Sequence, residues 1–278
     1  MAIDNDENEG SAAGPETTAT WPVRVTRPGI KKTIAVMSGK GGVGKSALTI
    51  LLAAGLRRKG LEVGILDADI TGPSIPMGLG MTGPVYFDQK GPAPVASRGG
   101  IKVISMNLLL PDENKAVIWR GPIITSVVRQ FYEDYDWGEL DYLLVDLPPG
   151  TADVPLTVMQ SIPLDGIVLV ISPQELAGMI VGKARNMAAS MDVPVIGLVE
   201  NMSYAVCEHC GERVEPFGAS HSEEAANAMG IPLLGRLPLD PEMSRLADEG
   251  RLDEYRSEQV EAVVDALLEQ ASDLTSPV

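Results

Sequence analysis

The sequence predicts an α/β fold in which a mostly parallel central sheet carries helices on both of its faces. Short runs that are apolar at nearly every position alternate with stretches of helical periodicity along the chain. Strands of a parallel sheet are buried on both faces, so they lack the alternation of apolar and polar residues that marks a half-exposed strand. A glycine-rich segment, residues 39–46, directly follows the first apolar run and precedes a helical pattern that ends near Gly60. A strand, a glycine-rich loop and a helix in this order are typical of a P-loop NTPase.

The remaining elements follow from the same periodicities. The predicted strands are residues 33–37, 63–66, 101–106, 142–145, 167–171, 195–199 and 231–234. Right-handed crossovers between them would bring ligands to the carboxyl ends of the strands. Residues 72–100 are rich in Gly and Pro, which predicts a long surface excursion. The last apolar stripe has helical spacing and consists of Val260, Val263, Val264, Leu267 and Leu268. It predicts a helix packed on the domain, with a partner-binding or membrane-binding helix as the alternative.

Composition favours one large domain in a chain of 278 residues, 45% of them hydrophobic. Residues 1–22 are acidic and aperiodic, so we expect a disordered tail before a single domain over residues 23–278. No apolar stretch reaches the roughly 20 residues that cross a bilayer, and the N-terminus does not resemble a secretory signal. We therefore expect a cytoplasmic protein. The net charge of −16 argues against nucleic acid as a partner, and a membrane is not expected either.

The glycine-rich segment matches the phosphate-binding pattern G-x-x-x-x-G-K-[ST]. Backbone N–H groups of such a loop surround the phosphates of a nucleotide, and the following helix adds the partial positive charge of its N-terminus. Lys45 would reach the β- and γ-phosphate oxygens, and Ser46 would hold Mg²⁺. The alternative is a tight turn without a ligand. The residues predicted to contact ATP are Gly39, Lys40, Gly41, Gly42, Val43, Gly44, Lys45, Ser46 and Ala47.

Three aspartates follow predicted strands and are candidates for the chemistry beside the phosphates. Asp146 ends an apolar strand, where a Walker B aspartate coordinates Mg²⁺. Asp67 and Asp69 end the second strand, and both could help to position Mg²⁺ and the attacking water. We assign the water to Asp69. The alternative for a single aspartate in such a place is an ordinary turn residue.

Two cysteines, Cys207 and Cys210, have the spacing that lets both thiolates bind one metal ion or cluster. Zinc and 4Fe-4S clusters normally take four protein ligands, whereas the chain adds only His209 and His221, neither well placed to complete the site. A two-fold axis between two chains would supply four thiolates. A thioredoxin-like redox pair remains an alternative, but it needs a helix N-terminus at the first cysteine, and residues 211–214 predict a loop or hairpin.

Several segments in this order and spacing resemble the Mrp/ApbC family of iron-sulfur cluster carrier ATPases. This family belongs to the deviant Walker A group, together with MinD, ParA and the nitrogenase iron protein. The resemblance covers residues from about 30 to 240, and it rests on the segments 39–46, 67–74, 146–151 and 200–203 and on the pair Cys207 and Cys210.

The resemblance implies roles for single residues. Lys40 would reach across a homodimer to the phosphates of the partner's nucleotide, as a third catalytic residue beside Lys45 and Asp69. Asn201 would contact adenine, although a strand-end turn residue is the alternative. Cys207 and Cys210 would bridge a 4Fe-4S cluster between subunits. The tail carries no cysteine, so it offers no second cluster site of the kind found in the eukaryotic scaffold ATPases.

The function that this resemblance implies is a slow, homodimeric ATPase that passes its cluster to apo iron-sulfur proteins. Three alternatives remain open at this point. They are a positioning ATPase like MinD or ParA, an electron donor like the nitrogenase reductase, and a non-catalytic interaction protein whose cysteines hold zinc.

Overall fold

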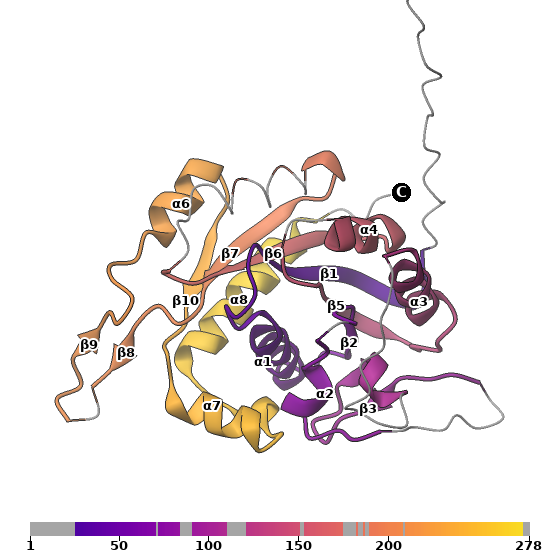
Figure 1. The fold of residues 1–278 in the computed structure, drawn as a ribbon, viewed down its shortest axis with the longest axis horizontal. Coiled ribbons are helices and arrows are strands. Elements are labelled where there is room, and N and C mark those ends of the chain that lie inside the picture. Colours follow the sequence, from indigo (N-terminus) through magenta and orange to yellow (C-terminus); the bar gives the residue numbers. More distant parts are fainter. Residues whose placement is uncertain are drawn as a thin grey trace, which may run out of the picture.

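An eight-stranded sheet forms the centre of the structure, a computed structural model that describes residues 26–70, 72–83, 91–109, 121–150, 153–174, 182, 186, 189–207 and 209–274. The strand order is β10-β7-β6-β1-β5-β2-β4-β3 (Figure 1). Every neighbouring pair is parallel except β3 with β4. The predicted α/β fold with a mostly parallel sheet is confirmed. A separate two-stranded hairpin, β8-β9, lies outside this sheet.

The elements have the following bounds. The strands are β1 Ile30–Ser38, β2 Val63–Asp67, β3 Val95–Ala96, β4 Lys102–Ile104, β5 Leu140–Asp146, β6 Gly166–Ile171, β7 Val195–Glu200, β8 Ala205–Val206, β9 Arg213–Val214 and β10 Leu233–Arg236. The α-helices are α1 Lys45–Arg58, α2 Ile75–Gly78, α3 Gly121–Glu133, α4 Asp153–Ser161, α6 Ser222–Met229, α7 Pro241–Asp248 and α8 Glu258–Ser272. Two short 3₁₀ helices are η1 Met106–Leu108 and η2 Leu252–Glu254.

The central strand β1 contributes to both hydrophobic cores because successive side chains of a strand point to opposite faces. Ile34 and Val36 enter the core that α1, α7 and α8 cover, whereas Ala35 and Met37 enter the core beneath α3, α4 and α6. All four are fully buried. This two-sided burial is the physical reason why the strand is apolar at every position from Ile34 to Met37.

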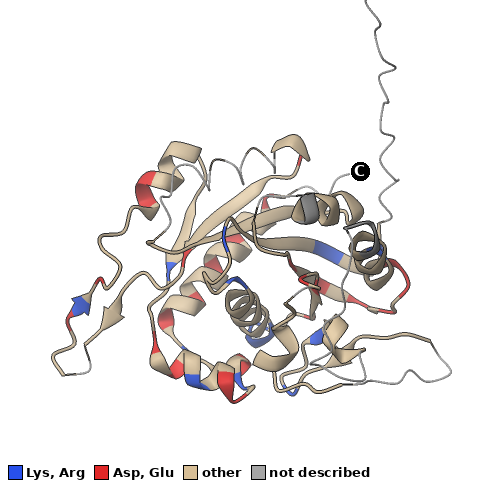
Figure 2. Cartoon of the chain, viewed as in Figure 1, with Lys and Arg blue, Asp and Glu red and all other residues tan. Residues whose placement is uncertain are grey.

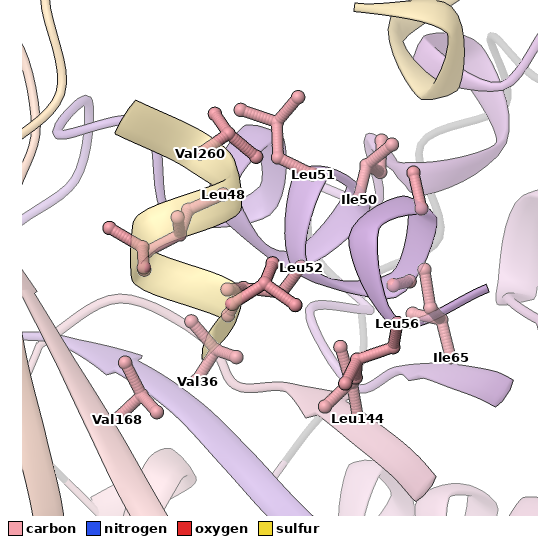
Figure 3. Close-up of a cluster of buried hydrophobic side chains, with 14 of the residues drawn as sticks. Val36, Leu48, Ile50, Leu51, Leu52, Leu56, Ile65, Leu144, Val168 and Val260 are labelled. Atoms are coloured by element: carbon pink, nitrogen blue, oxygen red, sulfur yellow. The ribbon is translucent and has the colours of Figure 1, made fainter. Parts of the chain in front are cut away.

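Helix α1 packs one face on the sheet and another on α8. Figure 3 shows Leu52 and Leu56 beside Val36 and Leu144 of the sheet, with Val260 of α8 near Leu48. The predicted apolar stripe of the last helix is buried except for the partly buried Leu268. The terminal helix therefore packs on the domain, as its periodicity predicts.

Residues 72–100 differ from the predicted surface excursion. They begin with helix α2, whose Ile75 is fully buried, and Leu79 after it is 2% exposed. They end with β3, which pairs antiparallel with β4 at the edge of the sheet. A proline in the first turn starts α2, so the Gly and Pro content that predicts a loop here also marks the start of a short buried helix.

Two other predictions differ in their bounds. The strand expected at 101–106 is shorter, because the chain turns into η1 after β4, and the strand expected at 231–234 begins two residues later as β10. The predicted tail, 1–22, lies outside the described residues, as do some residues of 72–100. Among the helices that the structure describes, none is long and apolar enough to cross a membrane.

Gly55 sets the close approach of α1 to α8, because a Cβ atom there would overlap Cγ2 of Val264. In Gly55→Ala we expect overpacking to cost about 1–3 kcal/mol of folding stability. The higher helix propensity of alanine offsets about 1 kcal/mol of this cost. Val264→Ala should relieve the overlap, so the double variant should lose less stability than the sum of the two single variants. Urea unfolding of the four proteins measures this. Additive losses would contradict the close contact.

Candidate phosphate site and cysteine hairpin

The loop between β1 and α1 lines a cavity of about 300 Å³ at the carboxyl edge of the sheet. Its lining consists of Ser38, Gly41, Gly42, Gly44, Lys45, Ser46, Ala47, Asp69, Gly72, Ser74 and Pro149. Gly42 and Gly44 have φ angles of 84° and 80°, a region that L side chains rarely adopt. A Cβ atom at Gly44 would also overlap the side-chain amide of Asn201. Both positions therefore require glycine, and a glycine-lined cavity of this size before a helix N-terminus fits phosphates.

Lys45 and Asp146 form a buried ion pair at the floor of this cavity. Lys45 Nζ lies 2.7 Å from Asp146 Oδ2, and their side chains are 6% and 0% exposed. Ser46 Oγ donates to the same carboxylate oxygen at 2.5 Å, and Thr49 Oγ1 donates to Asp146 Oδ1 at 2.7 Å. A buried charge needs this kind of pairing and hydrogen bonding, which β5 and α1 supply together. Ser46 and Asp146, both predicted Mg²⁺ ligands, thus offer adjacent oxygen atoms, the ligand type that Mg²⁺ prefers.

Asp67 lies beside Asp146 because β2 and β5 pair in parallel with these two residues in register. Its carboxylate accepts hydrogen bonds from Ser105 Oγ at 3.0 Å and from the Asp69 N–H group at 3.2 Å. Burial raises the pKa of Asp67 well above its ordinary value of 3.8, and the neighbouring Asp146 carboxylate raises it further. Asp69 is 9% exposed and lines the cavity, so of these two predicted residues it is Asp69 that faces the ligand space.

The other predicted nucleotide residues lie around this cavity in different ways. Lys40 is exposed and does not belong to the cavity lining, whereas Val43 is buried beneath the loop. Asn201 is 2% exposed, and its Nδ2 donates to the Val43 carbonyl at 2.9 Å. Its Oδ1 is buried and finds no hydrogen-bond partner in the part of the chain that the structure describes. The side chain of Asn201 therefore holds the backbone of the phosphate loop in this structure, and its adenine contact stays a prediction.

Sequence reasoning missed two residues of the site, Thr49 and Ser105. Thr49 stands one helical turn after Lys45, on the side of α1 that faces β5, and Ser105 directly follows β4. Thr49 donates a hydrogen bond to the buried Asp146 at the end of β5, and Ser105 donates one to the buried Asp67 at the end of β2. A threonine within an otherwise apolar helix face is the signal that could have identified Thr49.

The two cysteines lie on the β8-β9 hairpin, which projects from the β7 and β10 side of the sheet (Figure 1). The Cys207 N–H group donates to the Glu212 carbonyl at 2.9 Å, and the Gly211 N–H group donates to the Cys207 carbonyl at 2.8 Å. The predicted hairpin over 211–214 is thus present. The thioredoxin-like alternative does not fit, because Cys207 begins a hairpin turn instead of a helix.

The hairpin does not complete a metal site within one chain. Cys210 is exposed, with its Sγ 3.8 Å from Glu212 Oε2, and His209 is exposed beside it. The described residues, which exclude Glu208, contain no group of three or more His, Cys, Asp or Glu side chains that could hold a metal ion. Neither cysteine lines the phosphate cavity. The structure thus brings the loop and its aspartates together and keeps the cysteine pair apart from them.

Comparisons with known proteins identify relatives of the whole described fold. Residues 29–272 match the ParA family model of NUBPL iron-transfer P-loop NTPases. The chain is 49% identical to the iron-sulfur cluster carrier protein of Clostridium perfringens over 237 residues, which cover 82% of this chain and 83% of the relative. It is 45% identical to the iron-sulfur cluster carrier protein of Methanocaldococcus jannaschii over 258 residues, with coverage of 89% and 88%.

Solved structures show the same relationship. The nucleotide-binding protein of Archaeoglobus fulgidus in complex with ADP is 46% identical and superposes with a TM-score of 0.76, covering 84% of this chain and 91% of that one. The MinD cell division protein of Aquifex aeolicus has a TM-score of 0.61 at 20% identity, with coverage of 89% and 99%. This second likeness shows that the two proteins share a fold.

The raised pKa of Asp67 predicts that its buried carboxylate lowers the free energy of unfolding at neutral pH. Replacing Asp67 by a neutral residue should remove this loss. The folded protein keeps the Asp67 proton to higher pH than the unfolded chain, so stability should fall as the pH rises from about 4 through the folded pKa. An asparagine can accept the Asp69 N–H group and donate to Ser105. We therefore expect Asp67→Asn to raise the melting temperature of the nucleotide-free, metal-free protein near pH 7 and to flatten its dependence on pH.

Thermal unfolding from pH 5 to pH 8, in the presence of a chelator, measures this effect. The matched control is Asp141→Asn on the exposed end of β5, where Lys31 lowers the pKa of the carboxyl group. The control variant should not gain stability at pH 7. A melting temperature for Asp67→Asn below that of the wild-type protein at every pH would contradict the interpretation that the buried Asp67 carboxylate destabilises the fold.

Proposed function

The chain belongs to the ParA family of NUBPL-type iron-transfer P-loop NTPases, and we propose that it is an ATP-hydrolysing homodimer that carries a 4Fe-4S cluster between paired cysteine hairpins. In this proposal the iron-sulfur cluster is cargo, which the protein passes to apo iron-sulfur proteins in the cytoplasm. Residues 23–278 act as one domain. The observation that carries the proposal is a contrast between two sites: the phosphate loop has the residues that a nucleotide needs, whereas the described residues of the cysteine hairpin supply two thiols, half of the ligands that a cluster needs.

The phosphate loop supports the nucleotide part of the proposal. Its glycines Gly41, Gly42 and Gly44 line the cavity, and so does Lys45. When phosphates bind, Lys45 turns from Asp146 to the β- and γ-phosphate oxygens and so keeps a negative partner throughout. Ser46 and Asp146 would hold Mg²⁺, which neutralises charge on the same oxygens when bound. Asp69, at the cavity wall, accepts a proton from the attacking water or orients that water.

The exposed position of Lys40 supports a role outside its own site. A lysine that lies on the loop but outside the lining of the cavity is free to extend toward a second subunit. In the proposed dimer, Lys40 contacts the phosphates of the partner's nucleotide. Asp67 supports Asp69 through its hydrogen bond to the Asp69 N–H group, and it lies next to the proposed Mg²⁺ ligands.

The cysteine hairpin supports the cluster part of the proposal. Cys210 is exposed in the turn between β8 and β9, and the apolar residues Val206 of β8, Val214 of β9 and Phe217 after β9 are 50%, 52% and 37% exposed. Apolar exposure of this kind favours contact with another protein. A two-fold axis near the hairpin would bring four thiolates together and would cover these side chains.

A positioning ATPase of the MinD or ParA type is a weaker candidate. Its membrane-binding form needs a free amphipathic helix with a basic face. In α8 the apolar stripe is buried in the core, and the first turn carries Glu258 and Glu261. Figure 2 shows acidic residues, coloured red, along α7 and α8. The family relationship favours a cluster carrier over both this candidate and a zinc-bridged interaction protein.

The cluster proposal predicts one cluster for each dimer. Anaerobic reconstitution should give about four iron and about four sulfide per dimer, with absorbance near 400 nm, as expected for a 4Fe-4S cluster. Cys207→Ser and Cys210→Ser should each abolish stable iron binding, because each removes two of four ligands. ATP affinity should not change, since the hairpin does not line the phosphate cavity.

The control is His209→Ala, which lies between the cysteines and should keep normal iron binding. Zinc without iron after anaerobic purification from iron-replete cells would contradict the cluster proposal. A complete cluster on a protein shown by sedimentation to be monomeric would contradict the shared site.

The nucleotide proposal predicts two separable defects. Lys45→Ala should lose ATP binding by at least about tenfold, because Lys45 is the buried cation of the site. Asp69→Asn should bind ATP with near-normal affinity and hydrolyse it at least about tenfold more slowly. Titration calorimetry and a phosphate-release assay measure the two effects.

Lys45→Ala leaves Asp146 buried without its cation, so the folded state needs a check by circular dichroism. The double variant Lys45→Ala with Asp146→Asn removes both charges and should fold with the same binding defect. Wild-type ATP affinity in both variants would refute the loop assignment, and normal turnover in Asp69→Asn would exclude Asp69 from hydrolysis.

A further inference from the structure

Glu200, at the end of β7, is a buried carboxylate that accepts hydrogen bonds from both ends of the segment that carries the cysteine hairpin. We call these two ends, at Ser203 and Ser220, the base of the hairpin. The side chain of Glu200 is 1% exposed. Its Oε2 accepts hydrogen bonds from Ser203 Oγ, from Ser220 Oγ at 2.7 Å and from Arg236 Nε at 3.2 Å. Three hydrogen bonds on one buried oxygen, one of them from a cation, make a strong and well-defined contact.

These three donors come from three different segments. Ser203 lies on the limb that leads into the hairpin, Ser220 on the limb that leads out of it, and Arg236 on β10. Arg236 also lies 3.5 Å from Glu215 on the second limb. Glu200 therefore ties both limbs of the hairpin to the edge of the sheet.

Beyond this point the hairpin has few other constraints. Residues 209–219 are exposed, and β8 and β9 pair through only two residue pairs. The Arg213 guanidinium lies 4.4 Å from the centre of the Tyr204 ring and joins the two limbs to each other. The direction in which Cys207 and Cys210 point therefore depends on the contacts at the base.

The next residue along the chain, Asn201, reaches the phosphate loop. Its Nδ2 donates to the Val43 carbonyl, and it lies against Gly44. Its N–H group donates to the Ile171 carbonyl of β6 at 2.8 Å. Met202 follows with a φ of 57°, an uncommon conformation for a residue with a side chain. Two adjacent buried side chains thus contact the phosphate loop on one side and the cysteine hairpin on the other.

We propose that Glu200 is a positioning residue that, together with Asn201, couples nucleotide binding at the phosphate loop to the geometry of the cysteine hairpin. The proposal rests on the proposed function, because it takes the hairpin as the element that carries the cluster. Phosphates that bind to the loop change the position of the Val43 carbonyl, and Asn201 follows it. Because Glu200 and Asn201 are both buried, the shift passes to the hairpin base instead of being absorbed by solvent.

Thiol alkylation tests this coupling without a cluster. The rates for Cys207 and Cys210 are measured by mass spectrometry on reduced, metal-free protein, alone and with saturating Mg-ADP or a non-hydrolysable Mg-ATP analogue. In the wild-type protein, nucleotide should change the rate of at least one cysteine by about threefold or more. In Glu200→Gln the rates should rise, and the ratio with and without nucleotide should approach one. Nucleotide affinity should stay within about twofold of wild type.

The control is Glu242→Gln, which removes an equivalent charge from the exposed start of α7 and should keep the wild-type ratio. A second variant, Ser220→Ala, removes the hydrogen bond from Ser220 to Glu200 together with the local contacts of Ser220 with Ser222, and it leaves the buried carboxylate with its cation. It should show a smaller loss of the nucleotide effect, and it provides the test if Glu200→Gln does not fold.

Two results would overturn the proposal. One is a wild-type protein that binds nucleotide with no change in either alkylation rate. The other is faster alkylation in Glu200→Gln with the nucleotide ratio preserved, which is the result of a purely structural role. Failure of iron binding in the reconstitution experiment would refute the cluster function and leave these rates unaffected, so the two failures are distinguishable.

Discussion

The buried ion pair between Lys45 and Asp146 is the interaction on which the nucleotide site depends. Two charges that are buried away from water are stable only as a pair. The hydroxyl groups of Ser46 and Thr49 also donate hydrogen bonds to the carboxylate oxygens of Asp146. This requirement fixes the start of α1 against the end of β5. The pairing of β2 with β5 places Asp67 beside Asp146, and the pKa of Asp67 is raised first by burial and further by this neighbouring carboxylate. The charged groups of the site are therefore in place before a ligand binds, and in the proposed function a nucleotide with Mg²⁺ would exchange one set of charge partners for another.

The cysteine hairpin is the second feature of this chain that bears on its function. The likeness to MinD at 20% identity shows a shared fold, and a fold of this kind serves several functions. The hairpin follows β7 and precedes α6, and it adds two cysteines and exposed apolar side chains to the carboxyl edge of the sheet. The phosphate loop and the cysteine hairpin both lie at this edge, so residues at the end of β7 contact both of them. Glu200 and Asn201 occupy that position.

Much of the architecture could be predicted from the chain alone. The apolar runs predict the main parallel strands correctly, because a strand buried on both faces is apolar at successive positions. Residues Ile34 to Met37 are an example. Elements whose signal is weak were missed or shifted. Helix α2 was hidden by its Gly and Pro content, β3 has only two residues, and β10 begins two residues later than its apolar run suggests. Contacts with distant segments decided α2, which packs into the core beside α1, and β10, which pairs with β7, whereas β3 pairs with its neighbour β4 over two residues only.

The sequence by itself determined the fold class, the family and the identity of the phosphate loop, because these depend on residue spacing within short segments. Only the tertiary structure decided which side chains meet. The strand order puts Asp67 next to Asp146, brings Ser105 to Asp67, and sets Asn201 against Val43 although 158 residues separate them. It also joins Glu200, Ser220 and Arg236 at one buried oxygen. Spacing along a chain cannot specify such contacts, because they depend on which strands become neighbours in the sheet.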